Sequence, residues 1–223
     1  MLSKADMCCP AVTEVFTTSR DGAATAFLLA QLASRRGPIL WVQDRLSAQE
    51  GGLPYGRGIA GITGQDRPIL RVAARTPAEA LWAMEEGLEC SALSAVIGEV
   101  WGSPKVLDFT ATKRLALRSQ RSKVPLWVLR SDAEPSLSVA PDRWRVASAP
   151  STDNTLDARA PGEALWSAEL FRSRTRRPGT WVASHDRASD RLHLVAPLRD
   201  GAVGEDADPH PAPRLRPLGR GAA

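Results

Sequence analysis

The chain has 223 residues, 43% of them hydrophobic and 24% charged, and its formal net charge is +4 at pH 7. These values are typical of a globular protein, and no apolar stretch approaches the ~20 residues that a membrane span needs. The three cysteines exclude a disulfide framework and a zinc site, because two are adjacent and one stands alone. The first residues lack the apolar core of a signal peptide, so we expect a cytoplasmic protein without membrane contact.

Strands and helices alternate over the first two-thirds of the chain. Short apolar runs bounded by turn residues predict buried strands at 12–16, 38–42, 69–73, 93–97 and 125–129. Helices are predicted at 22–36, 76–90 and 108–123, the second opening with a capping box, Thr76-Pro-Ala-Glu79. Residues 45–68 are rich in glycine and polar residues, and we expect mostly loop there, with room for a short helix. This alternation predicts a parallel sheet with right-handed crossovers.

The pattern changes after Pro150. Strand-like runs at 165–171, 179–184 and 191–197 predict an antiparallel extension of the sheet over about residues 143–199. The expected fold class is therefore α/β, with a mostly parallel central sheet flanked by helices and antiparallel C-terminal strands. We divide the chain into an N-terminal extension (1–9), a core domain (10–199) and a tail (200–223). The tail is rich in proline and glycine with few large apolar residues, so we expect it to be disordered.

The loop after the first strand has the strand–loop–helix context of a phosphate-binding P-loop, G-x-x-x-x-G-K-[ST]. On that pattern Thr17 replaces the first glycine, Gly22 is the second, and Ala23 and Ala24 replace the lysine and the hydroxyl residue. The lysine would neutralise phosphate charge and the hydroxyl would bind Mg²⁺, and alanine can do neither. We therefore expect no ATPase activity, no catalytic residue, no cofactor and no metal.

Two acidic residues at the same edge of the sheet complete a candidate nucleotide site. Asp44 follows the second predicted strand, and Glu99 is expected directly after the fourth, where P-loop enzymes place the acid that orders Mg²⁺. The degenerate site thus comprises Thr17, Arg20, Gly22, Asp44 and Glu99, and we expect it to be inactive. An alternative stays open, a divergent ATPase that uses Arg20 for phosphate charge and Glu99 for Mg²⁺.

Four arginines crowd one hairpin-like segment, with no acid between Glu169 and Asp186: Arg172, Arg174, Arg176 and Arg177. One interpretation is a contact with phosphates or with an acidic partner. The other is a solvated hairpin, because residues 172, 174 and 176 would face the same way in a strand. Contact with DNA stays open.

The order of these elements resembles the core of the RecA family. Four segments are similar to the ImuA family, the RecA-like proteins of bacterial damage-inducible mutagenesis cassettes: LDFTATKRLALRSQRSKVPLWVLR (107–130), RWRVASAPS (143–151), LWSAELFRSRTRRPGTWVASHD (165–186) and RLHLVAPL (191–198). The resemblance covers about residues 10–200. It is specific in the second half and only RecA-like in the first, and it implies a RecA-like core.

The resemblance to ImuA implies a non-catalytic adaptor for translesion DNA synthesis in the SOS response to DNA damage. The implied partners are an ImuB-type protein, RecA and, indirectly, an error-prone C-family polymerase, while self-association stays open. The counterpart of the first DNA-binding loop of RecA (100–107) is short and that of the second (131–142) is acidic, so we expect no ATP-dependent RecA-type filament. A third interpretation is a DNA-binding accessory protein that uses the arginines at 172–177.

Overall fold

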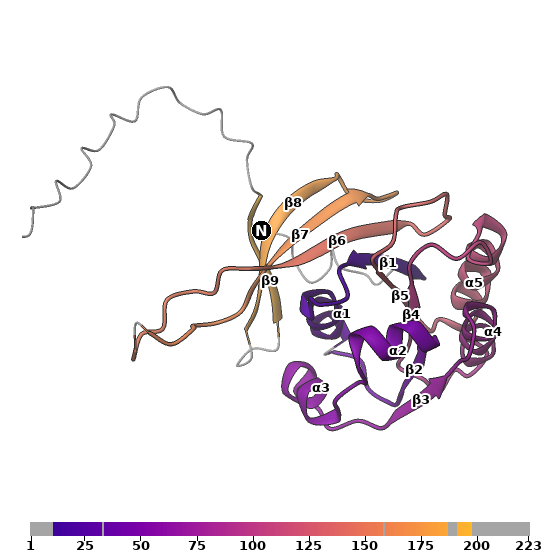
Figure 1. Cartoon of the computed structure of the whole chain (residues 1–223), viewed down its shortest axis with the longest axis horizontal. Coiled ribbons are helices and arrows are strands. Elements are labelled where there is room, and N and C mark those ends of the chain that lie inside the picture. Colours follow the sequence, from indigo (N-terminus) through magenta and orange to yellow (C-terminus); the bar gives the residue numbers. More distant parts are fainter. Residues whose placement is uncertain (1–10, 33, 158, 187–190, 198–223) are drawn as a thin grey trace, which may run out of the picture.

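One mixed sheet runs through the described part of the chain, residues 11–32, 34–157, 159–186 and 191–197 of the computed structural model (Figure 1). Its nine strands lie in the order β3-β2-β4-β5-β1-β6-β7-β8-β9. The strands are β1 (Val12–Thr17), β2 (Ile39–Gln43), β3 (Ile69–Ala73), β4 (Ala95–Trp101), β5 (Leu126–Ser131), β6 (Asp142–Ala149), β7 (Leu165–Arg172), β8 (Gly179–Asp186) and β9 (Arg191–Pro197). The helices are α1 (Ala23–Leu32), α2 (Arg45–Gly51), α3 (Gly56–Thr63), α4 (Pro77–Gly87) and α5 (Phe109–Ser122).

The first six strands of this order, β3 to β6, are all parallel to their neighbours. β1 is the middle strand of the nine, with Val15 opposite Leu129 of β5 on one side and Trp144 of β6 on the other. Its residues 12–16 are buried because helices cover both faces of this part of the sheet, as parallel strands require. The alternation of strands and helices predicted from the sequence is thereby confirmed.

The antiparallel part of the sheet begins later than we expected. β6 pairs in parallel with β1, and only β7, β8 and β9 add antiparallel strands. The predicted extension from about residue 143 was therefore wrong in its first strand. The sequence of β6 could not reveal its direction, because direction depends on which strand lies beside it.

Helices cover both faces of the parallel part of the sheet (Figure 1). α1 and α3 bury Phe27 and Ile59 in one hydrophobic cluster, and α4 and α5 bury Met84 and Leu115 in another on the opposite face. The predicted cap of α4 is present, since Thr76 Oγ1 accepts a hydrogen bond from the Glu79 amide at 3.2 Å. None of the helices in the described residues has the length and apolar character needed to cross a bilayer.

Two local predictions were wrong. Residues 45–68 contain two helices, α2 and α3, because Asp44 caps the first and Ile59 anchors the glycine-rich second in the core at 4% exposure. Glu99 lies inside β4, not after it, because pairing with β5 continues to Trp101. The predicted extension 1–9 and tail 200–223 lie outside the described residues.

Residues 150–164 join β6 to β7 and project from the sheet as an arm (Figure 1). Its two sides are held together by hydrogen bonds within the arm, from the Thr152 amide to the Glu163 carbonyl at 3.0 Å and from Asn154 Nδ2 to the Pro161 carbonyl at 3.2 Å. Leu156 near its tip is 96% exposed. The arm therefore owes its shape mainly to its own polar contacts.

Candidate functional site

The loop between β1 and α1 has the geometry of a capped helix start. Asp21 Oδ1 accepts a hydrogen bond from the amide of Ala23, the first residue of α1, at 2.9 Å. The amide of Asp21 in turn donates to the Thr18 carbonyl at 3.1 Å, which closes the turn. A helix N-terminus attracts anions through its free amides and its dipole. Here a carboxylate of the chain itself already occupies that position.

The same carboxylate ties the loop to β6. Asp21 Oδ2 accepts from the Ser148 amide and Asp21 Oδ1 from the Ser148 hydroxyl, both at 2.7 Å. Burial raises the pKa of Asp21, but the hydrogen bonds from Ser148 and Ala23 outweigh it, so the pKa lies below its ordinary value. The side chain is therefore ionised at neutral pH, and its negative charge repels a phosphate from the first turn of α1.

The two alanines that replace the P-loop lysine and hydroxyl residue belong to the core. Ala23 is 3% exposed and Ala24 is fully buried. Arg20 and Gly22 are exposed on the loop, and the hydroxyl of Thr17 is buried without a hydrogen-bond partner. A Cβ on Gly22 would meet no atom within 4 Å, so the fold itself does not demand glycine at this position.

Asp44 and Glu99 lie on the neighbouring strands β2 and β4, Asp44 directly after the end of β2 and Glu99 opposite Gln43 of β2. Asp44 is 2% exposed and accepts hydrogen bonds from the amides of Ser47 (2.7 Å) and Trp101 (3.1 Å). It therefore caps α2 and fixes the end of β4. Both oxygens of this carboxylate are used inside the fold.

The carboxylate of Glu99 is also used inside the fold. Its Oε1 accepts from Trp41 Nε1 at 2.7 Å and its Oε2 from Gln43 Nε2 at 2.8 Å. Burial raises the pKa of Glu99 above its ordinary value, although these hydrogen bonds act in the opposite direction. Among the described residues no three His, Cys, Asp or Glu side chains gather as metal ligands would.

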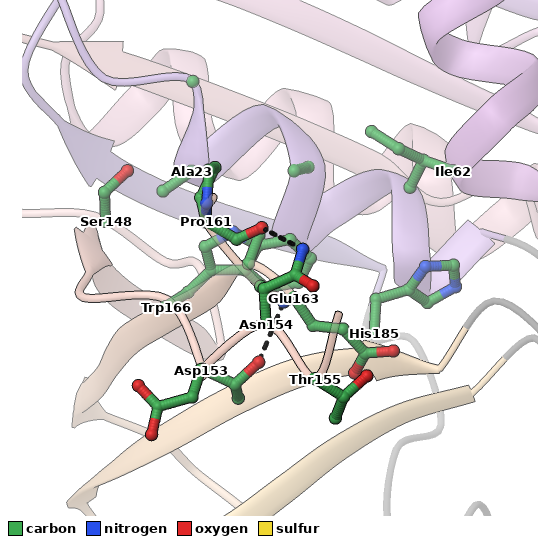
Figure 2. A pocket seen from close by; sticks show the side chains of 15 residues that line it. Ala23, Ile62, Ser148, Asp153, Asn154, Thr155, Pro161, Glu163, Trp166 and His185 are labelled. Carbon is green, nitrogen blue, oxygen red and sulfur yellow. Dashed lines mark hydrogen bonds between the residues drawn. The ribbon is translucent and has the colours of Figure 1, made fainter. Parts of the chain in front are cut away.

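A cavity of about 750 Å³ lies where α1, α3 and the arm meet (Figure 2). Its lining comes from Gly22, Ala23 and Ala26 at the start of α1, Ile62 of α3, Ser148 and Trp166 of the sheet, His185 of β8, and the arm residues Thr152, Asp153, Asn154, Thr155, Pro161, Gly162, Glu163 and Ala164. Of the five residues predicted to form the nucleotide site, only Gly22 lines it. Two carboxylates and no lysine or arginine line this cavity.

The four arginines predicted as a contact surface divide into two kinds. They lie at the β7–β8 turn, which we call the basic turn (residues 172–177). Arg176 is turned inward, where it forms an ion pair with Asp142 and stacks 5.3 Å from the centre of the Trp144 ring. The other three, Arg172, Arg174 and Arg177, are exposed. Only these three can reach a partner without loss of a buried contact.

A buried ion group links the three central strands. Arg143 Nε of β6 lies 2.6 Å from Glu14 Oε2 of β1, and Arg130 Nη1 of β5 lies 3.9 Å from Glu14 Oε1. Burial lowers the pKa of Arg130, and Glu14 opposes this effect. Both guanidinium groups also lie over the ring of Phe16. The group is inaccessible, so its role is to hold β1, β5 and β6 in register.

The structural roles of Asp21 and of the arm were not predicted from the sequence. Asp21 stands two residues before an apolar helix, and an aspartate there is a signal for a helix start. The hydrogen bonds between Asp21 and Ser148 could not be predicted from a local sequence pattern, because the two residues are 127 positions apart. The arm was not identified because its polar sequence is typical of an ordinary loop.

No family model matches the chain. The sequence is similar to Protein ImuA of two strains of Caulobacter vibrioides, with 29% identity over 210 residues that cover 86% of this chain and 82% of the relative. The crystal structure of the RadB recombinase has a similar fold, with a TM-score of 0.56 and 13% sequence identity over 88% of this chain and all of that chain. The predicted resemblance to ImuA and the RecA-like fold class are thereby confirmed.

Proposed function

We propose that this ImuA-like chain with a RecA-like fold is a non-catalytic adaptor in translesion DNA synthesis during the SOS response, acting in the cytoplasm. Its proposed partners are an ImuB-type protein and RecA, and through them an error-prone C-family polymerase. The observation that carries the proposal is the carboxylate of Asp21 at the first turn of α1. A nucleotide phosphate would need that position.

Phosphoryl transfer depends almost entirely on positive charge and positioning around the phosphates. Loss of a single arginine finger lowers the rate by about 10³ to 10⁵ in related enzymes. In this chain the lysine and the Mg²⁺ ligand are both replaced, by Ala23 and Ala24, and the acids Asp44 and Glu99 are engaged in internal hydrogen bonds. These features favour a role that depends on surfaces instead of hydrolysis.

Two exposed surfaces support an adaptor role. One is the set of three free arginines on the basic turn, Arg172, Arg174 and Arg177. The other is apolar and lies on α2 and on its link to α3, where Leu46, Leu53 and Tyr55 are 50%, 63% and 68% exposed. Large apolar side chains gathered at a surface are typical of protein interfaces.

The test is a binding experiment with the purified full chain immobilised and the ImuB-type protein, RecA and the C-family polymerase applied separately. We expect direct binding of the first two and binding of the polymerase only when the ImuB-type protein is present. ATP hydrolysis measured on the same sample should equal the buffer background. Absence of binding to both direct partners would overturn the adaptor, and so would hydrolysis that Glu99→Ala abolishes.

A matched pair of variants locates the contact. The triple variant Arg172→Gln, Arg174→Gln, Arg177→Gln removes the exposed charges of the basic turn. The control Lys105→Gln, Lys113→Gln, Arg121→Gln removes three other exposed positive charges, away from the basic turn. We expect partner binding to weaken only in the basic-turn variant. Salt screens exposed charges over about 10 Å, so a charge affects binding only when it lies close to the contact.

The same three arginines support a second candidate function, DNA binding as an accessory protein. Three phosphate contacts would make the logarithm of the DNA-binding constant fall with the logarithm of salt concentration with a slope of about −2.7 on duplex DNA. A titration of the chain against duplex DNA at several salt concentrations measures this slope. No binding at low salt, or a slope near zero, would exclude the DNA function and leave the adaptor unaffected.

A further inference from the structure

We propose that the cavity beside Ala23 binds the arginine-bearing segment 211–220 of this chain, PAPRLRPLGR. The cavity then takes a cationic peptide where a P-loop would take an anionic nucleotide. This inference is independent of the adaptor role. It rests on the lining of the cavity, on the charge of the segment and on the length of chain that connects them.

The cavity has the size of a ligand site. Its volume of about 750 Å³ falls within the 300–1,000 Å³ that small-ligand sites usually have. One wall is helical, with Ala26 of α1 and Ile62 of α3, and the floor includes the buried Trp166 of β7 (Figure 2). The opposite wall is the arm. An extended peptide could therefore lie between the helices and the arm.

The charge of the lining selects a cation. Asp153 and Glu163 both line the cavity and are exposed, and neither has an ion-pair partner among the described residues. Ser148, also in the lining, holds the ionised Asp21. A phosphate group would meet these two carboxylates and no lysine or arginine in the lining, and like charges repel. A guanidinium can bind a carboxylate with two hydrogen bonds and can also stack on an indole ring such as that of Trp166.

The segment 211–220 has the matching chemistry. It carries Arg214, Arg216 and Arg220 and no acidic residue. Leu215 lies between the first two arginines, so one apolar side chain is flanked by two cations. Prolines on both sides favour an extended conformation of low conformational entropy. In the cavity the leucine would face Ile62 and Ala26, and the arginines would face the carboxylates.

The connection is long enough. Pro197, the last residue of β9, pairs with Trp181 of β8, and His185 in the lining lies four residues further along that strand. Four residues of a strand span about 13 Å. The residues from 198 to 213 can span roughly 50 Å when extended. Reach therefore does not restrict the docking.

The docking should be weak and reversible, because the carboxylates are exposed and solvent screens their charge. Within one chain, however, a tethered segment acts at an effective concentration in the millimolar range. A site of millimolar affinity is then substantially occupied. Strong salt would release the segment, because it screens exposed charge pairs further.

The experiment is hydrogen–deuterium exchange of the arm and of the first turn of α1, at low salt and at 0.5 M NaCl, in four full-length proteins. These are the native chain, the pocket variant Asp153→Asn/Glu163→Gln, the segment variant Arg214→Gln/Arg216→Gln/Arg220→Gln, and the basic-turn variant Arg172→Gln/Arg174→Gln/Arg177→Gln. The pocket substitutions conserve shape, and the hydrogen bonds that hold the described residues of the arm together do not use these two carboxylates.

We expect the native chain and the basic-turn variant to exchange at the same rate in the arm. The pocket and segment variants should exchange roughly twofold faster or more at low salt, because a segment at millimolar effective concentration protects only part of the time. In 0.5 M NaCl all four should agree. Peptide 211–220 added at millimolar concentration to the segment variant should restore protection, and should fail to do so in a protein that also carries the pocket substitutions.

Equal exchange in all four proteins at low salt would overturn the proposal. Faster exchange in the basic-turn variant with native behaviour of the segment variant would also overturn it, since the arginines would then come from the turn of a second copy. Protection of the arm by Mg·ATP in place of the peptide would show that the cavity takes an anion and would contradict the charge argument.

Discussion

Asp21 shows how a single side chain can change the chemistry of a loop. The strand–loop–helix frame of a phosphate-binding loop is intact around it. Its carboxylate accepts hydrogen bonds from Ala23 and Ser148, so it caps α1 and joins the loop to β6. The same interactions that stabilise the fold place a negative charge where a phosphate would bind. Structural use of the loop and nucleotide binding therefore compete for one position.

We expect Asp21→Ala to lower the free energy of unfolding by about 1–2 kcal/mol, because α1 loses its cap and β6 loses its tie to the loop. Urea denaturation of the two proteins measures the difference. Ser148→Ala, which removes one of these hydrogen bonds, should cost less. Glu86→Ala on the exposed face of α4 is the control and should change stability by no more than about 0.5 kcal/mol.

The difference in the free energy of unfolding between the native chain and Asp21→Ala should depend on pH. The pKa of Asp21 is lower in the folded chain than in the unfolded one, so its stabilisation is complete above the unfolded value of about 3.9. The difference between the native chain and Asp21→Ala should therefore shrink as the pH falls below about 4. A difference that grows in acid would contradict the assigned hydrogen bonds.

The contribution of Glu99 to stability depends on pH in the opposite direction. Its folded pKa is raised, so the folded state holds the proton more tightly, and stability decreases as the pH rises from the unfolded value of about 4.3 through the raised one. Relative to Glu99→Gln, which does not titrate, the native chain should gain stability as the pH falls through this window. Urea midpoints at a series of pH values test this, and parallel curves would show that Glu99 does not titrate differently on folding.

At the scale of elements, the basic turn between β7 and β8 combines a structural and an exposed half. Arg176 pairs with Asp142, which is 1% exposed, and Ser173 Oγ donates to the other oxygen of that carboxylate at 2.6 Å. These contacts attach the turn to the start of β6. Arg172, Arg174 and Arg177 are exposed. A substitution in this turn therefore acts on stability or on binding, according to which half it changes.

We expect Arg176→Ala to destabilise the fold by about 3 kcal/mol, because it leaves a buried carboxylate without its cation. Arg174→Ala should stay within about 0.5 kcal/mol of the native chain, since its side chain is exposed. Thermal or urea denaturation distinguishes the two. Similar losses in both variants would mean that Arg176 does not pair with Asp142 in solution.

For the whole molecule, the RecA-like fold is present although Ala23 and Ala24 stand where a P-loop has its lysine and its hydroxyl residue. The sheet is held by apolar strands buried on both faces and by the Glu14–Arg143 ion pair, and neither requires a ligand. A fold of this kind can keep its surfaces while the site at the edge of the sheet changes. In such a fold, the surfaces that bind partners and the site that hydrolyses nucleotide can change independently of each other.

Mg·ATP at 1 mM should leave the melting temperature unchanged. A nucleotide bound with a dissociation constant of 10 µM would be present at a hundredfold excess and would stabilise the fold by about 2.7 kcal/mol. For a chain of this size each kcal/mol corresponds to about 2–4 °C. A thermal shift assay with Mg·sulfate as the ionic control decides the matter. A rise of several degrees would support the divergent ATPase that uses Arg20 and Glu99.

Much of the fold could be predicted because its signals are local. The run from Ile39 to Val42 is apolar at every position, which is typical of a strand buried on both faces. The cap at Thr76 follows from four adjacent residues. The helix at 56–63 could not be predicted, because its glycines disfavour a helix and only the burial of Ile59 against α1 compensates.

The sequence by itself determined that the chain forms a mostly parallel α/β sheet and that its P-loop lacks the lysine and the hydroxyl. Both follow from residue identities at fixed local spacing. Only the tertiary structure decided that Asp21 occupies the first turn of α1 with help from Ser148, that Glu99 is used inside β4, and that Arg176 is not free. Each of these depends on a partner brought close by folding, and charge and hydrogen bonding act over a few ångströms of space, whatever the distance along the chain.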